Sequence, residues 1–156
     1  MSEAPERAVI IRPVERSDMQ GLHQLMCSLA DNESQREHLT VTPDRLAQTG
    51  VGENRQWRGF VAEADGVLVG YATYTQDFHI WSGSPRFSLD DIYVRPENRS
   101  GGLGEKLMRR VFDEAQEAGA YVSWTVLPDN ERAIAFYQRL GASYATIGKC
   151  GWRPEK

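Results

Sequence analysis

The chain has little cysteine, no long apolar run and no excess of positive charge. Its two cysteines, Cys27 and Cys150, match no zinc motif and are too few for a disulfide framework. No segment approaches the roughly 20 apolar residues of a membrane span, and Met1–Glu6 lack the regions of a signal peptide. A formal net charge of −4 argues against nucleic acid as the main partner, because such a domain should be basic. We therefore expect a cytoplasmic protein without membrane or nucleic-acid partners.

The composition that remains is that of a soluble globular protein, with 40% hydrophobic and 26% charged residues. We expect residues 1–156 to form a single domain. Periodicity and turn signals predict strands at Ala8–Arg12, Gly59–Ala64, Val67–Thr75, Arg86–Val94, Tyr121–Leu127 and about Ser143–Ile147.

Capping and stop signals place the helices between these strands. One helix should start at a capping box of Ser17 and Gln20, one runs from Thr42 to near Gly50, one from Gly102 to Gly119, and one from Asp129 or Asn130 to Gly141. Antiparallel strands followed by a crossover helix predict an α/β fold. Its sheet should be mixed, mostly antiparallel and twisted, with helices on both faces.

A strand, a glycine loop and a helix follow one another in the most informative segment. Leu89–Val94 is the strand, and Arg99–Gly104 holds three glycines before the helix begins. Glycine lets the backbone come close to a ligand, since it has no Cβ. The first turn of a helix has unpaired N–H groups, and the helix dipole favours an anion there. The segment therefore predicts a phosphate-binding loop.

Two familiar nucleotide-binding loops are excluded by the residues that follow. A Walker A loop needs Lys and then Ser or Thr after its last glycine, but Gly104 is followed by Glu105, Lys106 and Leu107. A dinucleotide fingerprint needs a glycine three residues past Gly-x-Gly, where this chain has Leu107. The hairpin expected upstream also departs from the βαβ unit that both loops require. The phosphate must therefore belong to another carrier.

The pattern Arg99-x-x-Gly102-x-Gly104 after an apolar strand resembles the pyrophosphate-binding motif of the GCN5-related N-acetyltransferases, the GNAT superfamily. Downstream, Asn130-x-x-Ala133-x-x-Phe136-Tyr137-x-x-x-Gly141-Ala142 is similar to the second acetyl-CoA motif of that superfamily. The resemblance covers about Ile10 to Arg153 and implies acetyl-CoA as co-substrate, no metal and a homodimer. The residues that it assigns to acetyl-CoA are Ile92, Tyr93, Val94, Arg99, Ser100, Gly101, Gly102, Leu103, Gly104, Asn130, Ala133, Tyr137 and Arg139.

Within the superfamily, the chain resembles the diamine acetyltransferase group, which includes the spermidine/spermine and thialysine acetyltransferases. The resemblance lies in Leu89–Val94, Trp81-Ser82-Gly83 and Gly151-Trp152-Arg153, and in the N-terminal segments Leu29–Glu33, Leu46 and Gly50-Val51-Gly52. The group typically has Glu-Asp where this chain has Asp90-Asp91. It also commonly has an acidic residue where this chain has Cys150, which offers no anion to a distant ammonium. The resemblance therefore implies a small cationic amine as acceptor and leaves polyamine specificity open.

The resemblance also implies direct attack of an amine on the acetyl-CoA thioester. Tyr137 matches the general acid of the family and would protonate the leaving thiolate. Asp90 is the candidate base or proton relay, directly or through a water. A backbone N–H near Ile92 would stabilise the thioester oxygen if the strand bulges there. The candidate contacts of the substrate cation are Asp91, Glu33, Trp81 and Trp152.

Each candidate also has a purely structural interpretation. Tyr137 shares a helix stripe with Ala133 and Phe136 and would serve equally as a core tyrosine. Asp90 and Asp91 are adjacent, so they share a pocket only if the strand is irregular. The tryptophans would serve packing as well as cation–π binding, and Glu33 matches a solvated helix end.

The predicted function is transfer of an acetyl group from acetyl-CoA to a primary amine of a polyamine, diamine or lysine-like substrate. Within the same enzyme class, the alternative acceptors are an aminoglycoside, an amino acid or a protein lysine. From another class, the alternative is a non-catalytic CoA-binding sensor. A sensor does not need a residue that protonates a leaving thiolate, as Tyr137 would. Among the possible acceptors, the two aspartates favour a free cationic amine.

Overall fold

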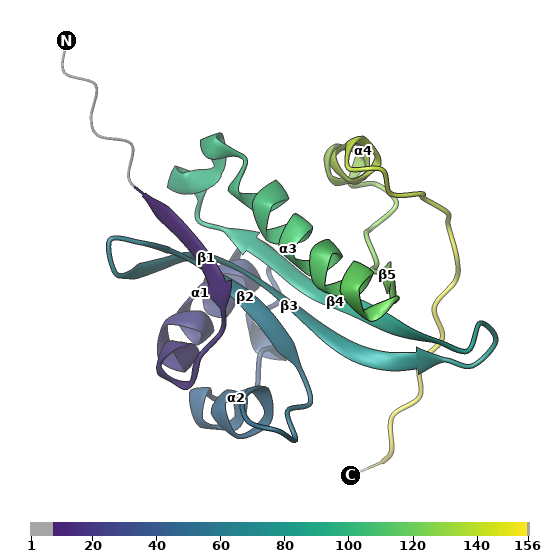
Figure 1. The fold of residues 1–156 in the computed structure, drawn as a ribbon, viewed down its shortest axis with the longest axis horizontal. Coiled ribbons are helices and arrows are strands. Elements are labelled where there is room, and N and C mark those ends of the chain that lie inside the picture. Colours follow the sequence, from purple (N-terminus) through teal and green to yellow (C-terminus); the bar gives the residue numbers. More distant parts are fainter. Residues whose placement is uncertain (1–7, 156) are drawn as a thin grey trace. The chain divides into compact units, whose positions relative to one another are not determined.

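The computed structural model describes residues 8–155, which form two compact units that meet in the sequence at Trp124 and Thr125. The first unit contains the strands β1 (Val9–Pro13), β2 (Arg58–Ala64), β3 (Val67–His79), β4 (Ser84–Val94) and β5 (Tyr121–Ser123). Its helices are α1 (Met19–Asn32), α2 (Pro43–Gly50) and α3 (Leu103–Ala118), with 3-10 turns η1 (Arg16–Asp18), η2 (Arg36–His38) and η3 (Pro96–Gly101) (Figure 1). The second unit contains α4 (Glu131–Arg139).

The sheet of the first unit has the strand order β1-β2-β3-β4-β5. The pairs from β1 to β4 are antiparallel, as hairpins and meanders require, whereas β4 and β5 are parallel. The parallel pair is possible because α3 crosses back over the sheet between these two strands. The predicted α/β fold with a mixed, mostly antiparallel sheet is confirmed.

Helices cover the two faces of this sheet, with α1 and α2 on one side and α3 on the other (Figure 1). The α1 side holds a core of Met19, Leu22, Leu25, Leu46, Val61, Tyr71 and Tyr93. On the other side, the buried residues of α3 are Leu103, Leu107, Met108, Val111 and Ala115. Strand residues alternate between the two cores. Val61 therefore joins the α1 side while Phe60 packs under the Arg110 guanidinium of α3, 4.8 Å from the ring centre.

Several helix ends lie where local signals predicted them. The Thr42 hydroxyl accepts a hydrogen bond from the N–H of Arg45 at 3.2 Å, and α2 ends at Gly50. Gly119 closes α3 in the left-handed conformation. The Asn130 side chain accepts from the N–H of Ala133 and caps α4. Caps depend on a few neighbouring residues, so the sequence alone was enough to predict them.

The predicted capping box of Ser17 and Gln20 is wrong, because a tertiary ion pair sets the start of α1. The helix begins at Met19, directly after Asp18, whose carboxylate is buried. Asp18 accepts from the Arg12 guanidinium at 2.7 Å and from the N–H of Glu15 at 2.7 Å. Burial alone would raise the pKa of Asp18, but these hydrogen bonds outweigh it and hold that pKa below its usual value.

Two strand predictions near the C-terminus also need correction. The strand expected at Tyr121–Leu127 ends at Ser123, because its pairing with β4 stops at Ser88. The strand expected at Ser143–Ile147 is irregular chain. A strand is held by backbone hydrogen bonds to a neighbouring strand. Residues 143–147 pair with no strand in the part of the chain that the structure describes.

Candidate active site

A β-bulge in β4 sets the geometry of the two adjacent aspartates. Thr73 of β3 pairs with Asp91, but the next residue, Tyr74, pairs with Leu89, so Asp90 is an extra residue in β4. A bulge bends its strand and leaves the extra residue out of the ladder. Without it, Asp91 would point to the same face as Leu89. With it, Asp91 lies on the α1 face, in register with Thr73 and two residues from Tyr93.

Two neighbouring carboxylates act on Asp91 at this bulge. Burial, followed by the charges of Asp90 and Glu33, raises the pKa of Asp91 to about 6. Burial likewise raises the pKa of Asp90. Glu33 is the exposed residue directly after α1. Among the described residues, no arginine or lysine forms an ion pair with any of the three. The structure thus brings together three of the acidic residues singled out in the sequence and supplies no cation to them.

The glycine loop connects β4 to α3 with an open surface. Gly102 takes the left-handed conformation, with φ of 66°, and is the N-cap of α3. Because it has no side chain, it provides no cap for the first N–H groups of the helix. A Cβ added at Gly101, Gly102 or Gly104 would meet no atom within 4 Å. The loop therefore presents bare backbone N–H groups, as a bound pyrophosphate needs.

Arg99 lies in the 3-10 turn η3 that precedes this loop. Its Nε donates to the carbonyl of Val94 at 2.8 Å, and its guanidinium lies 5.7 Å from the centre of the Tyr93 ring. The hydrogen bond fixes the side chain to the end of β4, and the rest of the guanidinium remains exposed for an anion. Ile92, Tyr93 and Val94 precede it at the end of β4, Ser100 follows it in η3, and Leu103 is the first residue of α3.

The second unit holds the other residues assigned to acetyl-CoA. Ala133, Tyr137 and Arg139 lie on α4, which Asn130 caps. Tyr137 packs against Phe136 with ring centres 5.5 Å apart, and burial raises the pKa of the Tyr137 phenol. The phenol therefore keeps its proton at neutral pH, which a general acid requires.

Both tryptophan candidates are exposed, and Trp81 lies away from the carboxylates of the bulge. Trp81 lies in the turn between β3 and β4 and is 97% exposed. Asp91 is seven residues beyond the start of β4, about 20 Å along an extended strand. Trp152 belongs to the second unit and is 85% exposed, close in sequence to the exposed Cys150. Their contact with a substrate stays a prediction.

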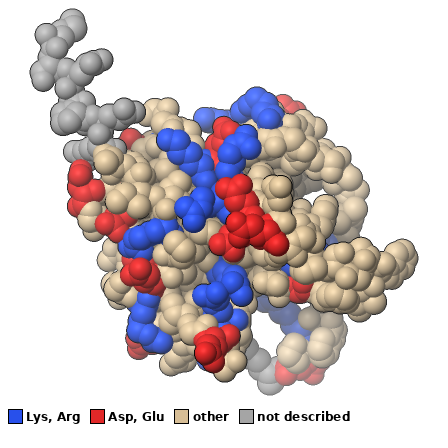
Figure 2. All heavy atoms as spheres, in the orientation of Figure 1, with Lys and Arg blue, Asp and Glu red and all other residues tan. Residues whose placement is uncertain are grey.

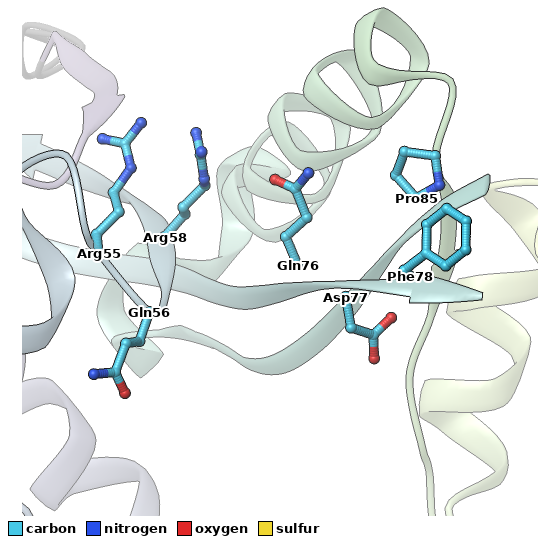
Figure 3. Close-up of a pocket in the computed structure, with 7 residues that line it drawn as sticks. All are labelled: Arg55, Gln56, Arg58, Gln76, Asp77, Phe78 and Pro85. Carbon is cyan, nitrogen blue, oxygen red and sulfur yellow. The ribbon is translucent and has the colours of Figure 1, made fainter. Parts of the chain in front are cut away.

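The structure also has an open hollow that sequence reasoning missed, with a volume of about 540 Å³. It is lined by Arg55, Gln56, Arg58, Gln76, Asp77, Phe78 and Pro85. Figure 3 shows the Arg55, Arg58 and Gln76 side chains on one side of the strands and Asp77 on the other. Asp77 is paired with Arg86 at 2.8 Å. The hollow lies at the last part of β3, where that strand pairs with the beginning of β4, and no local motif in the sequence signals it.

Charge is distributed unevenly around α3. Figure 2 shows a band of Lys and Arg side chains on the face viewed there, with a smaller group of Asp and Glu beside it. Lys106, Arg109 and Arg110 belong to α3, and Arg109 pairs with Glu105 at 2.8 Å. The helix that follows the glycine loop carries these three cations beside four acidic residues, so it is not basic as a whole.

Residues 8–155 were also considered for features of membrane and metal-binding proteins, and they contain neither kind. Within this range, no helix combines the length and apolar character needed to cross a bilayer. The same range contains no group of three or more His, Cys, Asp or Glu residues arranged to hold a metal ion.

Comparison with known proteins agrees with this fold and this loop. Residues 22–142 match the model of the "Acetyltransferase (GNAT) family". Thialysine N-epsilon-acetyltransferase of Bos taurus is 32% identical over 153 residues, which cover 92% of this chain and 89% of that protein. Streptothricin acetyltransferase of Streptomyces lavendulae is 38% identical over 98 residues, covering 62% of this chain and 50% of that protein. The chain belongs to the GNAT family of acetyltransferases.

Solved structures show the same fold at lower identity. An aminoglycoside acetyltransferase from an uncultured soil metagenomic sample, in complex with trehalose, superposes with a TM-score of 0.78 at 18% identity, covering 95% of this chain and 97% of that one. An aminoglycoside N-acetyltransferase in complex with CoA gives 0.72 at 20% identity, covering 99% and 100%. The family match and the thialysine acetyltransferase relatives confirm that the chain is a GNAT protein and an acetyltransferase, as the sequence motifs predicted.

Proposed function

We propose that the protein transfers an acetyl group from acetyl-CoA to a primary amine of a small cationic substrate, a lysine-like amino acid, diamine or polyamine. The observation that carries this proposal is the bulge at Asp90, which places Asp91 on the α1 face near Glu33 without a cation of the protein. A substrate ammonium would neutralise this site. The thialysine acetyltransferase relatives support a lysine-like acceptor.

The fit to acetyl-CoA rests on the open loop between β4 and α3. The backbone from Arg99 to Gly104 would bind the pyrophosphate, with the exposed part of the Arg99 guanidinium beside it. The bulge leaves backbone N–H groups of β4 without a ladder partner, and one near Ile92 would donate to the thioester oxygen as it gains charge.

The chemical roles follow from the reaction that this family catalyses. The amine nitrogen attacks the thioester carbon, the carbon–sulfur bond breaks and the sulfur takes a proton. Tyr137 would give that proton, since its phenol is neutral at rest. Asp90, directly or through a water, would accept the proton that the substrate ammonium must lose before attack. Asp91 and Glu33 would hold the cation.

The test is a panel of amines with acetyl-CoA, followed by detection of released thiol. The panel contains a lysine-like amino acid, a diamine, a polyamine, an aminoglycoside, an α-amino acid and a lysine-containing peptide. We expect turnover with the free cationic primary amines. Activity confined to the aminoglycoside, the α-amine or the peptide would move the assignment to another GNAT activity. Acetyl-CoA binding without transfer to any amine would support the sensor. The homodimer and the cytoplasmic location stay predictions.

The left-handed glycine before α3 offers a test of the loop. Replacing Gly102 by Ala should lower the free energy of unfolding by about 1 kcal/mol, because a Cβ is strained at φ of 66°. Relief of this strain shifts the loop, and we expect the Kd for acetyl-CoA to rise about tenfold. Calorimetric titration measures the second effect.

Gly119→Ala is the matched control for this prediction. Gly119 has nearly the same backbone conformation, with φ of 63°, at the other end of the same helix. Its variant should lose similar stability and keep the acetyl-CoA affinity of the unmodified protein. Equal affinities in both variants would show that the loop does not bind the cofactor.

A further inference from the structure

The hydroxyl of Tyr71 is buried without a hydrogen-bond partner. The side chain lies in the core between β3 and α1 and is 0% exposed, and its oxygen has no partner among the described residues. Buried polar groups are nearly always hydrogen-bonded, so an exception needs an explanation. A phenylalanine would fill the same volume without this penalty, as Phe60 and Phe87 do in the core on the other face.

A carboxylate without a partner lies close to this hydroxyl. Tyr71 pairs with Tyr93, and the next same-face rung of the ladder pairs Thr73 with Asp91. Tyr71 and Asp91 are thus diagonal neighbours, about 7–8 Å apart at their Cα atoms, a distance that a tyrosine can span. Among residues 8–155, no side chain or backbone N–H donates to the Asp91 carboxylate, and no cation pairs with it.

The Tyr71 phenol and the Asp91 carboxylate are near enough for the charge of Asp91 to act on the phenol. Burial and then the charge of Asp91, followed by that of Glu33, raise the pKa of Tyr71. The other titratable groups that act on the pair are Tyr93 and Asp90 of β4 and Cys27 of α1. None of them is a cation. The phenol therefore stays protonated as a donor, while the carboxylate beside it lacks one.

We propose that Tyr71 is a positioning residue for Asp91: its hydroxyl donates a hydrogen bond to the ionised carboxylate and holds it in the orientation that binds the acceptor ammonium. The hydroxyl is unpaired in this structure, so the proposed bond requires the two side chains to turn toward each other. The proposal rests on the function proposed above, and it assigns Tyr71 a role that sequence reasoning missed.

The test compares Tyr71→Phe with Tyr74→Phe. Tyr74 lies on the same strand, is also buried and faces the other core, so its variant controls for loss of a buried phenol. In Tyr71→Phe, the acid limb of kcat/KM for the amine should move up by about one pH unit, because the carboxylate loses a donor. The KM for the amine should rise about tenfold, with kcat and the KM for acetyl-CoA nearly unchanged.

A purely structural tyrosine gives a different result. Tyr71→Phe would then melt at a higher temperature, keep its acid limb and keep its amine KM, and the proposal would be overturned. If the unmodified protein acetylates no amine, the proposed function fails, and an NMR titration of the labelled Asp91 carboxyl decides the inference separately. A midpoint about one unit higher in Tyr71→Phe supports the hydrogen bond, and equal midpoints refute it.

Discussion

Replacing Asp91 by Asn should make the protein more stable and the enzyme less active. Burial and the neighbouring charges raise the pKa of Asp91 from 3.8 to about 6. The folded state therefore holds this proton more tightly than the unfolded state does, and ionisation costs stability. The cost begins as pH rises above about 4 and is complete above about 6. We expect Asp91→Asn to gain about 2 kcal/mol of unfolding free energy at about pH 8 and nothing below pH 4.

The loss of activity has the same pH dependence as the gain in stability, because both effects depend on an ionised Asp91 carboxylate. An amide cannot attract the acceptor ammonium, so kcat/KM for the amine should fall about thirtyfold or more at neutral pH. In the unmodified protein, kcat/KM should decline as pH falls below about 6, because the carboxylate is protonated. This limb should be absent in Asp91→Asn.

Asp113→Asn is the control for Asp91→Asn, because it removes the same charge from an exposed position on α3. Chemical denaturation at the two pH values and the pH profile of kcat/KM measure the two effects. Asp113→Asn should change neither. An Asp91→Asn variant with unchanged amine kinetics would remove Asp91 from the acceptor site, whatever its stability.

Replacing Tyr137 by Phe should lower kcat by about a hundredfold or more, the usual contribution of a general acid. The departing thiolate would then have to be protonated by water. Phenylalanine keeps the ring of Tyr137 and removes only the hydroxyl, so the Kd for acetyl-CoA should stay within about twofold. Single-turnover kinetics separate the chemical step from binding.

Tyr144→Phe is a suitable control within the same unit. Tyr144 is 39% exposed, and its hydroxyl lies 3.4 Å from that of Thr146. We expect its kcat to match that of the unmodified protein. If Tyr137→Phe retains full kcat, another group protonates the thiolate, and Tyr137 returns to its interpretation as a packing residue of α4.

Much of the fold was predictable because its signals are local. The Thr42-Pro43 start and the Gly119 end involve a few consecutive residues, and both lie where they were predicted. The capping box at Ser17 failed although its pattern is also local. Arg12, six residues before Asp18, holds that carboxylate and determines where α1 begins. Nothing in the local pattern indicated this contact.

Strand pairing and the geometry of the site were harder to predict from the sequence. The segment 143–147 was predicted as a strand, but a strand also needs a neighbour, which the sequence does not specify. The bulge at Asp90 is a property of two strands in register, so the sequence could only state the condition under which Asp90 and Asp91 share a site. The glycine loop was predictable because its residues are consecutive.

The most direct test of the central claim is the identity of the reaction product. The protein is incubated with acetyl-CoA and a lysine-like amino acid, and the product is examined by mass spectrometry with fragmentation. We expect one acetyl group on the side-chain nitrogen for each CoA released, with Asp91→Asn forming far less of it. A product acetylated only at the α-amine, or no acetylated amine at all, would contradict the account.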